Sequence, residues 1–541
     1  MQAKVKRIDH LGIIAGVAKD LGIADFINEM VGRKKLETVS AGDVVVGMIL
    51  NGLAFISRPL MLTPQFFENK PLELLIGKGV KAEHMNRHKL GRVLDRVQQC
   101  GTEFIFKQIS LKACQQEKVD MTFAHADTTT YSLTGEYDQD FDTERIEITY
   151  GHSKAKRPDL KQVVQELITS QDGGIPLITK AFDGNASDTV ILRERAQNLM
   201  KEFAKSGERI FVADSKLYAS KTAETLNHMN FITRVPSTIK TEKAAIDQAI
   251  KADEKWNDIG NGYKIQEIDS DQFDIQDQRW IIIFSEQAQK RVKKTIGKAI
   301  TKENERIKKE VLHLKAERFT CEEDAKKKAL RIAKKWGLHT IMSMKLTPIR
   351  RCEKRGRPSK ETPQTYEWQI NVQFEPDEAR IALKLQRRSC FVLATNVSNR
   401  KLPAQQVLIN YKEQDKTEKG FAFLKGSSFF TSSLFLKKPG RIEGLLMIMV
   451  LSLLVYSIAQ RRVRQQLKLL KSTIPNQINQ PTNRPTMRWI FQLFEGVNLV
   501  LVQHQGSTIS LLEGVTEIRQ KIIDLLAGNT KEIYQNFKMA T

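Results

Sequence analysis

Apolar residues in the first part of the chain recur at the spacing of amphipathic helices. Residues 10–31, 40–56 and 88–109 each place them three or four positions apart. Side chains at that spacing lie on one face of a helix and can pack against neighbouring helices. Residues 1–118 are therefore predicted to form a compact helical domain.

The pattern changes after this domain to short β-rich runs. The runs lie at 121–127, 145–151, 160–170, 174–182, 209–214 and 231–236. Three successive strands, a crossover, a fourth strand, a helix over 219–229 and a fifth strand predict a mixed sheet flanked by helices. Residues 119–236 are assigned to the first part of this α/β domain.

The next segment, 237–388, is rich in Lys and Glu and reads as an inserted module. It contains a helical run over 285–336 and a basic Pro/Gly linker at 354–363. A strand over 389–397 returns to the sheet pattern, and a helix over 402–426 follows it, with Gly426 just past its end. We assign 389–465 to the second part of the α/β domain and 466–541 to a helical tail.

The length of the chain and its net charge limit the number of domains and the kinds of partner that can be expected. At 541 residues the chain exceeds what one core organises, so several domains are expected. Lys and Arg number 86 against 63 Asp and Glu, a formal net charge of +23. Such a surface attracts polyanions, and nucleic acid is the first partner to consider. An anionic membrane surface would attract it too.

The most apolar stretch, 444–459, is shorter than the ~20 residues that cross a bilayer and is predicted to be a buried helix. The N-terminal apolar stretch is interrupted by Asp9 and Asp20, so no signal peptide is expected and the protein should stay in the cytoplasm. Five scattered cysteines without C-x-x-C spacing argue against disulfides and zinc fingers. A membrane-associated basic protein remains the alternative from another class.

Three carboxylates carry the candidate chemistry. Asp127 and Asp214 each end an apolar strand run. If these strands are neighbours, their ends place the two carboxylates side by side, close enough to share a metal ion. Glu418 lies in the helix after 402, where Tyr411, Gln414, Glu418 and Lys425 recur at helical spacing. Turn aspartates and an ordinary charged surface helix are the plainer alternatives.

The run Tyr411-x2-Gln414-x3-Glu418-x6-Lys425 resembles the Tyr-x2-Arg-x3-Glu-x6-Lys signature of the YREK group of bacterial insertion-sequence transposases. Gln414 stands where the signature has Arg. The segments HADTTTYSL, YGHSKAKRPDLKQ, VADSKLYAS and LATN are also similar to that group, and the resemblance covers about residues 1–465. It implies a ribonuclease-H-like fold with a mostly β insertion between the second Asp and the Glu. It also implies a metal-binding catalytic triad of Asp127, Asp214 and Glu418, with Tyr411, Gln414 and Lys425 touching DNA.

The implied chemistry is phosphodiester hydrolysis and strand transfer with two Mg²⁺ (or Mn²⁺) ions per active site, because hard oxygen ligands suit these cations. The resemblance further implies a hairpin intermediate in cut-and-paste transposition. The expected partners are double-stranded DNA, both the terminal inverted repeats and the target, and a second copy of the chain in a homodimer. The helical domain 1–118 is expected to bind the element ends, and the enzyme to be cytoplasmic and nucleoid-associated.

Further basic residues are candidate DNA contacts. Lys154, Lys156, Arg157 and Lys161 lie close to the first aspartate in the chain and could neutralise phosphates. Arg355 and Arg357 belong to an AT-hook-like KRGRPSK run. Trp256, Trp280 and Trp368 could stack on a flipped base, although core packing is the plainer role. Two alternatives keep the fold: a decayed copy that binds DNA without cutting, and a nuclease without strand transfer.

Overall fold

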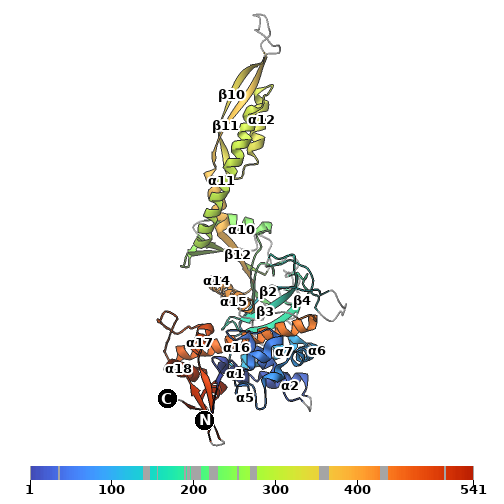
Figure 1. Cartoon of the computed structure of the whole chain (residues 1–541). Coiled ribbons are helices and arrows are strands. Elements are labelled where there is room, and N and C mark those ends of the chain that lie inside the picture. Colours follow the sequence, from blue (N-terminus) through green and yellow to red (C-terminus); the bar gives the residue numbers. More distant parts are fainter. Residues whose placement is uncertain are drawn as a thin grey trace. The chain divides into compact units, whose positions relative to one another are not determined.

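The computed structural model divides into two compact units, Met1–Thr233 with Ile409–Thr541 (unit 1) and Arg234–Leu408 (unit 2). Figure 1 traces the whole chain. The structure describes residues 2–33, 37–137, 146–154, 156–187, 191, 195, 209–218, 229–252, 255–268, 277–351, 365–426, 436–504, 507–535 and 537–539.

Five neighbouring strands form the sheet of unit 1 in the order β4-β3-β2-β5-β6. β2, β3 and β4 pair antiparallel, whereas β5 and β6 run parallel to β2. This is the predicted mixed sheet of an α/β, ribonuclease-H-like core. The strands span Phe123–Leu133 (β2), Lys161–Ser170 (β3), Pro176–Phe182 (β4), Ile210–Ala213 (β5) and Asn230–Arg234 (β6).

One predicted strand, 145–151, is wrong. Of its described residues, only Thr149 makes a β-bridge, to Gln162 at the start of β3. The segment instead crosses the ends of two strands, since Gln162 N donates to Thr149 O at 2.9 Å and Gly184 N donates to Glu147 O at 2.9 Å. The alternating apolar residues that predicted a strand here are equally compatible with a segment that crosses the ends of two strands. The helix predicted over 219–229 lies almost wholly outside the described residues.

The N-terminal part of unit 1 is helical, as predicted. Its third helix starts at a capping box in which Ser40 Oγ accepts from Asp43 N and Asp43 accepts from Ser40 N at 3.0 Å. Short 3₁₀ turns lie at Leu60–Leu62 and Ala82–Met85. The helices span Leu11–Asp20 (α1), Ile23–Val31 (α2), Ala41–Gly52 (α3), Thr63–Phe67 (α4), Leu72–Leu75 (α5), Arg87–Gln99 (α6) and Thr102–Gln116 (α7).

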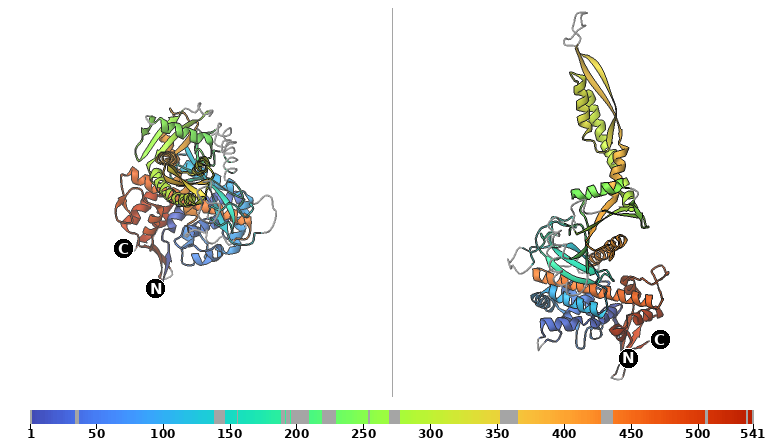
Figure 2. Two further views of the ribbon diagram at one scale, coloured as in Figure 1. Left: turned by 90° about the horizontal axis from the view of Figure 1, so that it is seen from above. Right: turned by 180° about the vertical axis from the view of Figure 1, so that it is seen from behind.

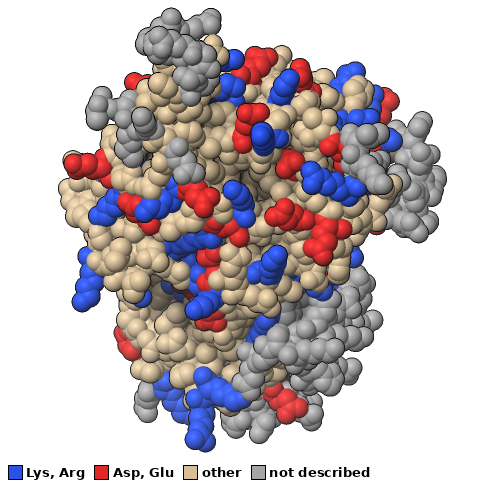
Figure 3. Space-filling model, turned by 90° about the horizontal axis from the view of Figure 1, so that it is seen from below, with Lys and Arg blue, Asp and Glu red and all other residues tan. Residues whose placement is uncertain are grey.

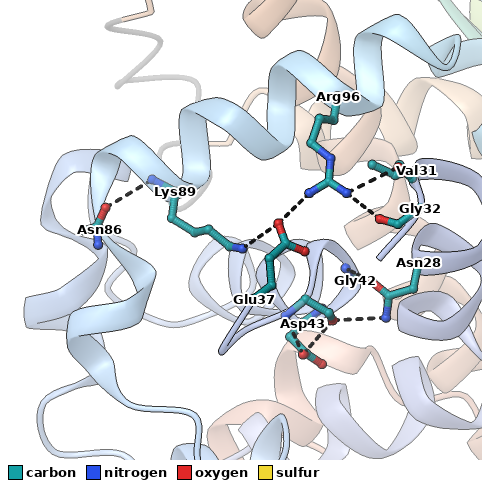
Figure 4. A network of polar contacts seen from close by, with 10 residues as sticks. Asn28, Val31, Gly32, Glu37, Gly42, Asp43, Asn86, Lys89 and Arg96 are labelled. Atoms are coloured by element: carbon teal, nitrogen blue, oxygen red, sulfur yellow. Dashed lines mark hydrogen bonds and ion pairs between the residues drawn. The ribbon is translucent and has the colours of Figure 1, made fainter. Parts of the chain in front are cut away.

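A polar network ties three of these helices together (Figure 4). Glu37 accepts from Arg96 of α6 at 2.8 Å and pairs with Lys89 of the same helix at 3.3 Å. Asn28 of α2 accepts from the N–H of Gly42 at the start of α3 at 2.8 Å. Two of the basic side chains of α6 therefore hold the fold together in this helical domain.

The helix α16, Pro439–Leu469, runs through the centre of unit 1. It contacts α1, α3, α6 and α7 and also β4 and α15, and Figures 1 and 2 show it between the N-terminal helices and the sheet. Its length and composition would suit a membrane span, but 89% of its apolar window is buried inside the protein. The predicted buried helix is confirmed.

Charged residues near both ends of α16 are anchored by partners from distant parts of the chain. Arg441 forms a two-point ion pair with Asp95, each bond 2.7 Å long. Arg462 is held at 2.5 Å by Asp20 and at 2.6 Å by Glu117. These pairs fix the register of α16 against α1, α6 and the end of α7.

The two ends of the chain pack together within unit 1. β1, Gln2–Arg7, pairs antiparallel with β15, Asn498–His504. Tyr534 donates to Asp9 O at 2.5 Å. The predicted helices of the tail are present, but its sheet with β1 was not predicted. The other tail elements are Ile474–Pro475 (β13), Pro481–Thr482 (β14), Met487–Leu493 (α17), Ser507–Glu513 (β16), Glu517–Leu526 (α18), Gly528–Gln535 (α19) and Lys538–Met539 (β17).

The single helix predicted over 402–426 is wrong, because the structure has two, Ala404–Lys412 (α14) and Asp415–Leu424 (α15). Between them the chain tightens into turns in which Gln414 N donates to Tyr411 O at 3.3 Å and Lys416 N donates to Glu413 O at 3.0 Å. Tyr411 therefore does not lie on one continuous helical face with Glu418 and Lys425.

Unit 2 contains antiparallel strands in the order β12-β9-β8-β7 and the helix α10, Lys240–Lys251. Trp280 of β9 is 1% exposed and belongs to the core. The predicted strand over 389–397 is observed as β12. The strands span Asn257–Asp258 (β7), Tyr263–Ile268 (β8), Arg279–Ser285 (β9) and Cys390–Thr395 (β12).

The rest of unit 2 is an arm built from helices and one hairpin. The 31-residue helix α11, Glu286–Ala316, is followed by α12, Glu322–Ala333, and both lie along the hairpin of β10, His339–Arg351, and β11, Thr365–Pro376 (Figures 1 and 2). The helix α13, Glu378–Ser389, closes the arm. The mostly β insertion implied by the resemblance is therefore wrong, while the helical run predicted from the residues is confirmed.

Candidate active site

Asp127 and Asp214 lie side by side on two neighbouring strands, Asp127 within β2 and Asp214 directly after the last residue of β5. The parallel register pairs Ala126 with Ala213, and Asp127 and Asp214 are the next residues of the two strands. Paired residues of neighbouring strands point to the same face of a sheet, so both carboxylates leave at the same level and on the same side. The two strands are neighbours, as the prediction required, but Asp127 does not end its strand, because β2 continues to Leu133 and stays paired with β3.

The surroundings of the two carboxylates favour a bound cation. Burial raises the pKa of Asp127, and the nearby Asp214 raises it further, whereas Lys154, the N–H of Thr128 and Lys216 lower it. That N–H donates to Asp127 Oδ1 at 2.7 Å. Asp214 Oδ1 accepts from Lys216 N at 3.0 Å. A positive charge placed between the two carboxylates would oppose the rise that Asp214 causes in the pKa of Asp127.

Lysine side chains stand close to Asp127. Lys154 donates to Thr128 Oγ1 at 2.8 Å, which ties its loop to β2. Lys425 Nζ lies 5.7 Å from the ring centroid of Tyr131, also on β2. Burial lowers the pKa of Lys425, Lys154 lowers it further, and Asp127 raises it. Lys154 and Lys425 therefore place positive charge close to Asp127 on β2, where they can attract an anion.

The helix α15 covers the face of the sheet that carries Asp127. Thr417 Oγ1 is 2.7 Å from Thr169 Oγ1 on β3. Thr169 pairs with His125, and residues two apart in a strand share a face, so Thr169 lies on the face of Asp127. Glu418 follows Thr417, is exposed, and lies on the side of α15 that also carries Lys425 two turns later.

The third carboxylate does not complete a metal cluster in this structure. Among the described residues, no three His, Cys, Asp or Glu side chains are grouped so that they could hold a metal ion. The donor chemistry of the aspartate pair nevertheless fits a hard divalent cation, because carboxylate oxygens are its preferred ligands. Glu418 lies in the same unit, as an exposed residue of the helix α15 that packs against this face of the sheet.

The remaining residues that were predicted to contact DNA lie in different structural environments. Arg157 forms a two-point ion pair with Asp159, and Lys161 Nζ lies 6.0 Å from the ring centroid of Tyr150. Lys156 is exposed, with a positive φ of 58°. Gln414 is 9% exposed and precedes α15 as its N-cap. Tyr411 is half-buried at the end of α14.

Of the three candidate tryptophans, only Trp280 is in the core, whereas Trp256 and Trp368 are half-buried. Trp280 is fully buried, and Trp256 donates from Nε1 to Ala249 O at 3.2 Å. Trp368 exchanges backbone hydrogen bonds with Phe319. Arg355 and Arg357 lie outside the described residues.

Sequence reasoning missed two residues of the site. Lys216 Nζ is 3.9 Å from Asp214 Oδ2, and the ring of Tyr131 lies next to Lys425. Lys216 follows the second aspartate by two positions, which was a usable signal. Tyr131 could be placed only once β2 was known to continue beyond Asp127.

The opposite face of the sheet carries a buried charge cluster. Glu166 of β3, paired in register with Thr128, is completely buried and accepts from Arg195 at 2.7 Å. Arg195 also pairs with Glu103 of α7. Burial raises the pKa of Glu166 to about 7 although Arg195 opposes the rise. This cluster lies behind the sheet from Asp127 and binds α7 to it.

The surface charge is mixed on the face seen from below in Figure 3. Lys and Arg side chains there are interspersed with Asp and Glu. In this view the net charge of +23 does not gather into one basic patch.

Comparisons with known proteins cover parts of the chain. The family described as "Domain of unknown function (DUF4277)" matches residues 3–111. Comparison with curated proteins gives no match. Among solved structures, the chain is similar to "Cryo-EM structure of piggyBac transposase synaptic complex with hairpin DNA (SNHP)", with a TM-score of 0.35 and 8% identity over 91% of this chain and 82% of that one. The aspartate pair lies outside the residues that the family matches.

Proposed function

We propose that this protein is a DNA transposase of an insertion sequence, which cleaves and joins DNA at a site formed by Asp127, Asp214 and Glu418. The observation that carries the proposal is the parallel register of β2 and β5, which sets two half-buried carboxylates side by side on inner strands of the sheet, at the point where β5 ends. The packing of α15 on the same sheet face supports Glu418 as the third member.

These carboxylates would hold Mg²⁺ or Mn²⁺, two ions per site, which when bound supply charge stabilisation for an in-line displacement at phosphorus. Asp127 and Asp214 would orient the cleaved phosphodiester through that shared cation site. Lys154 and Lys425 would hold the anionic backbone of DNA against this part of the sheet, since charged hydrogen bonds to phosphate are strong where solvent is partly excluded. No side chain needs to act as a nucleophile, because water and then a DNA 3′-hydroxyl attack.

Further features are part of the proposal. The helical domain 1–118 would bind terminal inverted repeats, and the site would then act on target DNA. A hairpin on the element end, a homodimeric complex and a nucleoid-associated location in the cytoplasm follow from the resemblance of the run at 411–425 to the YREK group.

The test measures nicking and joining of DNA that contains the sequences flanking the gene. Asp127→Ala, Asp214→Ala and Glu418→Ala should each abolish Mg²⁺-dependent nicking and leave DNA binding in a mobility-shift assay nearly intact. Asp415→Ala is the matched control, because Asp415 is an exposed carboxylate of the same helix that pairs with Lys419. Near-normal nicking by one triad variant removes that residue from the site.

Two outcomes separate the alternatives of the same fold. Binding without any nicking by the wild-type chain identifies a decayed copy. Nicking without joining identifies a nuclease.

A further inference from the structure

The hairpin of unit 2 has one covered and one open face. The covered face packs Ile370 and Val372 of β11, which are 0% and 5% exposed, against Ile307 and Leu314 of α11 and Ala325 of α12. Leu346 pairs with Ile370 in the register and joins the same cluster. Because side chains alternate along a strand, Asn371 and Gln373 point away from the covered face. Gln369, by contrast, reaches α11 and donates to Lys315 O at 2.6 Å.

The open face is polar and rich in hydrogen-bonding groups. Its members are exposed, and they alternate in sequence with the covered residues. The register sets Lys345 opposite Asn371 and Ser343 opposite Gln373, and Ser343 Oγ donates to Gln373 Oε1 at 2.7 Å. The polar, exposed part of this face comprises Ser343, Lys345, Thr347, Asn371 and Gln373, and it ends where the register sets Ile349 opposite Glu367.

The arm that presents this face is basic. Residues 286–389 contain twice as many Lys and Arg as Asp and Glu. Several of the acidic side chains are already paired along the helices, as Glu322 is with Lys326 and Glu303 with Arg306. A long, narrow and basic element is complementary to a polyanion with a groove.

We propose that the open face of the β10–β11 hairpin lies in the major groove of duplex DNA and reads base edges there. The major groove admits a two-stranded β-ribbon, and a strand of twelve residues spans about 40 Å, roughly one turn of the double helix. Asn and Gln side chains match the N6 and N7 atoms of adenine, and Lys matches N7 and O6 of guanine. The register shift between Ile341 and Ser343 adds twist of the kind that a ribbon needs to follow a groove.

Duplex RNA is a poor occupant, because its major groove is too deep and narrow for side chains to read. A second copy of this chain is disfavoured by the like charge of the two arms. The inference depends on the proposed function only for the choice of DNA as ligand, and it assigns a second contact surface that is made of residues other than those of the cleavage site.

The experiment uses the full chain, fluorescence anisotropy and a short DNA duplex. The triple variant K345A/N371A/Q373A should bind at least about tenfold more weakly than the wild type, since the loss of one good base contact is already enough for a change of about that size. Lys327→Ala is the matched control: it removes an equally exposed cation from α12, on another side of the arm, and should change affinity little.

Modified bases locate the groove. Replacing adenine and guanine by their 7-deaza analogues removes a major-groove acceptor and should weaken wild-type binding, but it should hardly affect the triple variant. Replacing guanine by inosine removes the minor-groove amino group and should have little effect. Equal binding by wild type and triple variant, insensitivity to 7-deaza bases, or equally arm-dependent binding of duplex RNA would each overturn the inference.

The proposed catalytic function and the proposed role of the hairpin can be contradicted independently of each other. Asp127→Ala should lose nicking yet keep the sensitivity to 7-deaza bases. If the wild-type chain nicks DNA but shows no such sensitivity, only the role of the hairpin is wrong. If arm-dependent binding persists while nicking is absent, the proposed catalytic function is wrong.

Discussion

The hydrogen bond between Thr417 and Thr169 is expected to hold α15 on the sheet and so to position Glu418. Both hydroxyl oxygens are in fully buried residues and lie 2.7 Å apart, and Thr417 also reaches His125 O at 3.4 Å. Thr417→Val keeps the shape and removes the hydroxyl. It leaves the hydroxyl of Thr169 without this partner, which costs about 1–3 kcal/mol for a buried polar group.

The cost should appear as local opening of α15. Because the chain has two compact units, one global unfolding free energy is poorly defined, and hydrogen exchange by mass spectrometry measures the helix directly. A loss of about 1–3 kcal/mol corresponds to exchange about five- to a hundredfold faster in peptides covering Asp415–Leu424. Nicking should fall with it, since Glu418 follows Thr417, and Thr417→Ser should restore both.

A double-mutant cycle with Thr169→Val tests the contact itself. If the hydroxyls interact, the double variant should cost about 1 kcal/mol less than the sum of the single variants. Additive effects, or unchanged exchange in α15 after Thr417→Val, would show that the helix is held by other contacts and that Glu418 does not depend on this one.

Three further predictions concern stability. Gly16→Ala places a Cβ 2.5 Å from the backbone of Thr530 and should lower the Tm by several degrees, whereas Gly297→Ala, in open space on α11, should leave the Tm unchanged. Equal melting temperatures of the two variants would contradict the close packing of α1 and α19. Arg462→Met leaves Asp20 and Glu117 without their partner and should cost about 3–5 kcal/mol in chemical unfolding of unit 1, with Arg462→Lys in between; a smaller loss for Met than for Lys would refute the pairing argument. Burial raises the pKa of Glu166 from 4.5 to about 7, so the stability that its protonated form contributes is fully present below pH 4.5 and is lost as the pH rises through 7. Glu166→Gln should therefore flatten this part of the plot of Tm against pH. An unchanged slope would contradict the assignment of this pH dependence to Glu166.

Local patterns in the sequence were enough to find the aspartate pair. Asp127 and Asp214 each follow a short apolar run, which is a local signal, but β2 continues to Leu133, so only Asp214 marks the end of a strand. That the two strands are neighbours was a condition of the prediction, and the parallel register of Ala126 with Ala213 meets it. The sequence could not give the setting of Glu418, because helical spacing alone does not reveal the turn at Gln414 that separates α14 from α15.

The elements that sequence reasoning missed depend on distant partners. β1 is a short polar run whose partner β15 lies almost five hundred residues later, so no local pattern marks it. The hairpin of β10 and β11 has alternating residues, but the helices that cover one side of it decide which face is buried. The segment at 145–151 shows the reverse case, in which β-like residues lie across strand ends without forming a ladder.

The pairing of β1 with β15 has a consequence for synthesis on the ribosome. Gln2 emerges first, yet its partner Gln503 is made nearly the whole chain later. At about 5–20 residues per second, the first strand waits on the order of 25–100 s before its ladder can form. During that interval the apolar face of α1 lacks α16 and α19, which cover it in the finished protein. The newborn chain should therefore need a holding chaperone, and unit 1 should close only after β15 and α19 have been made.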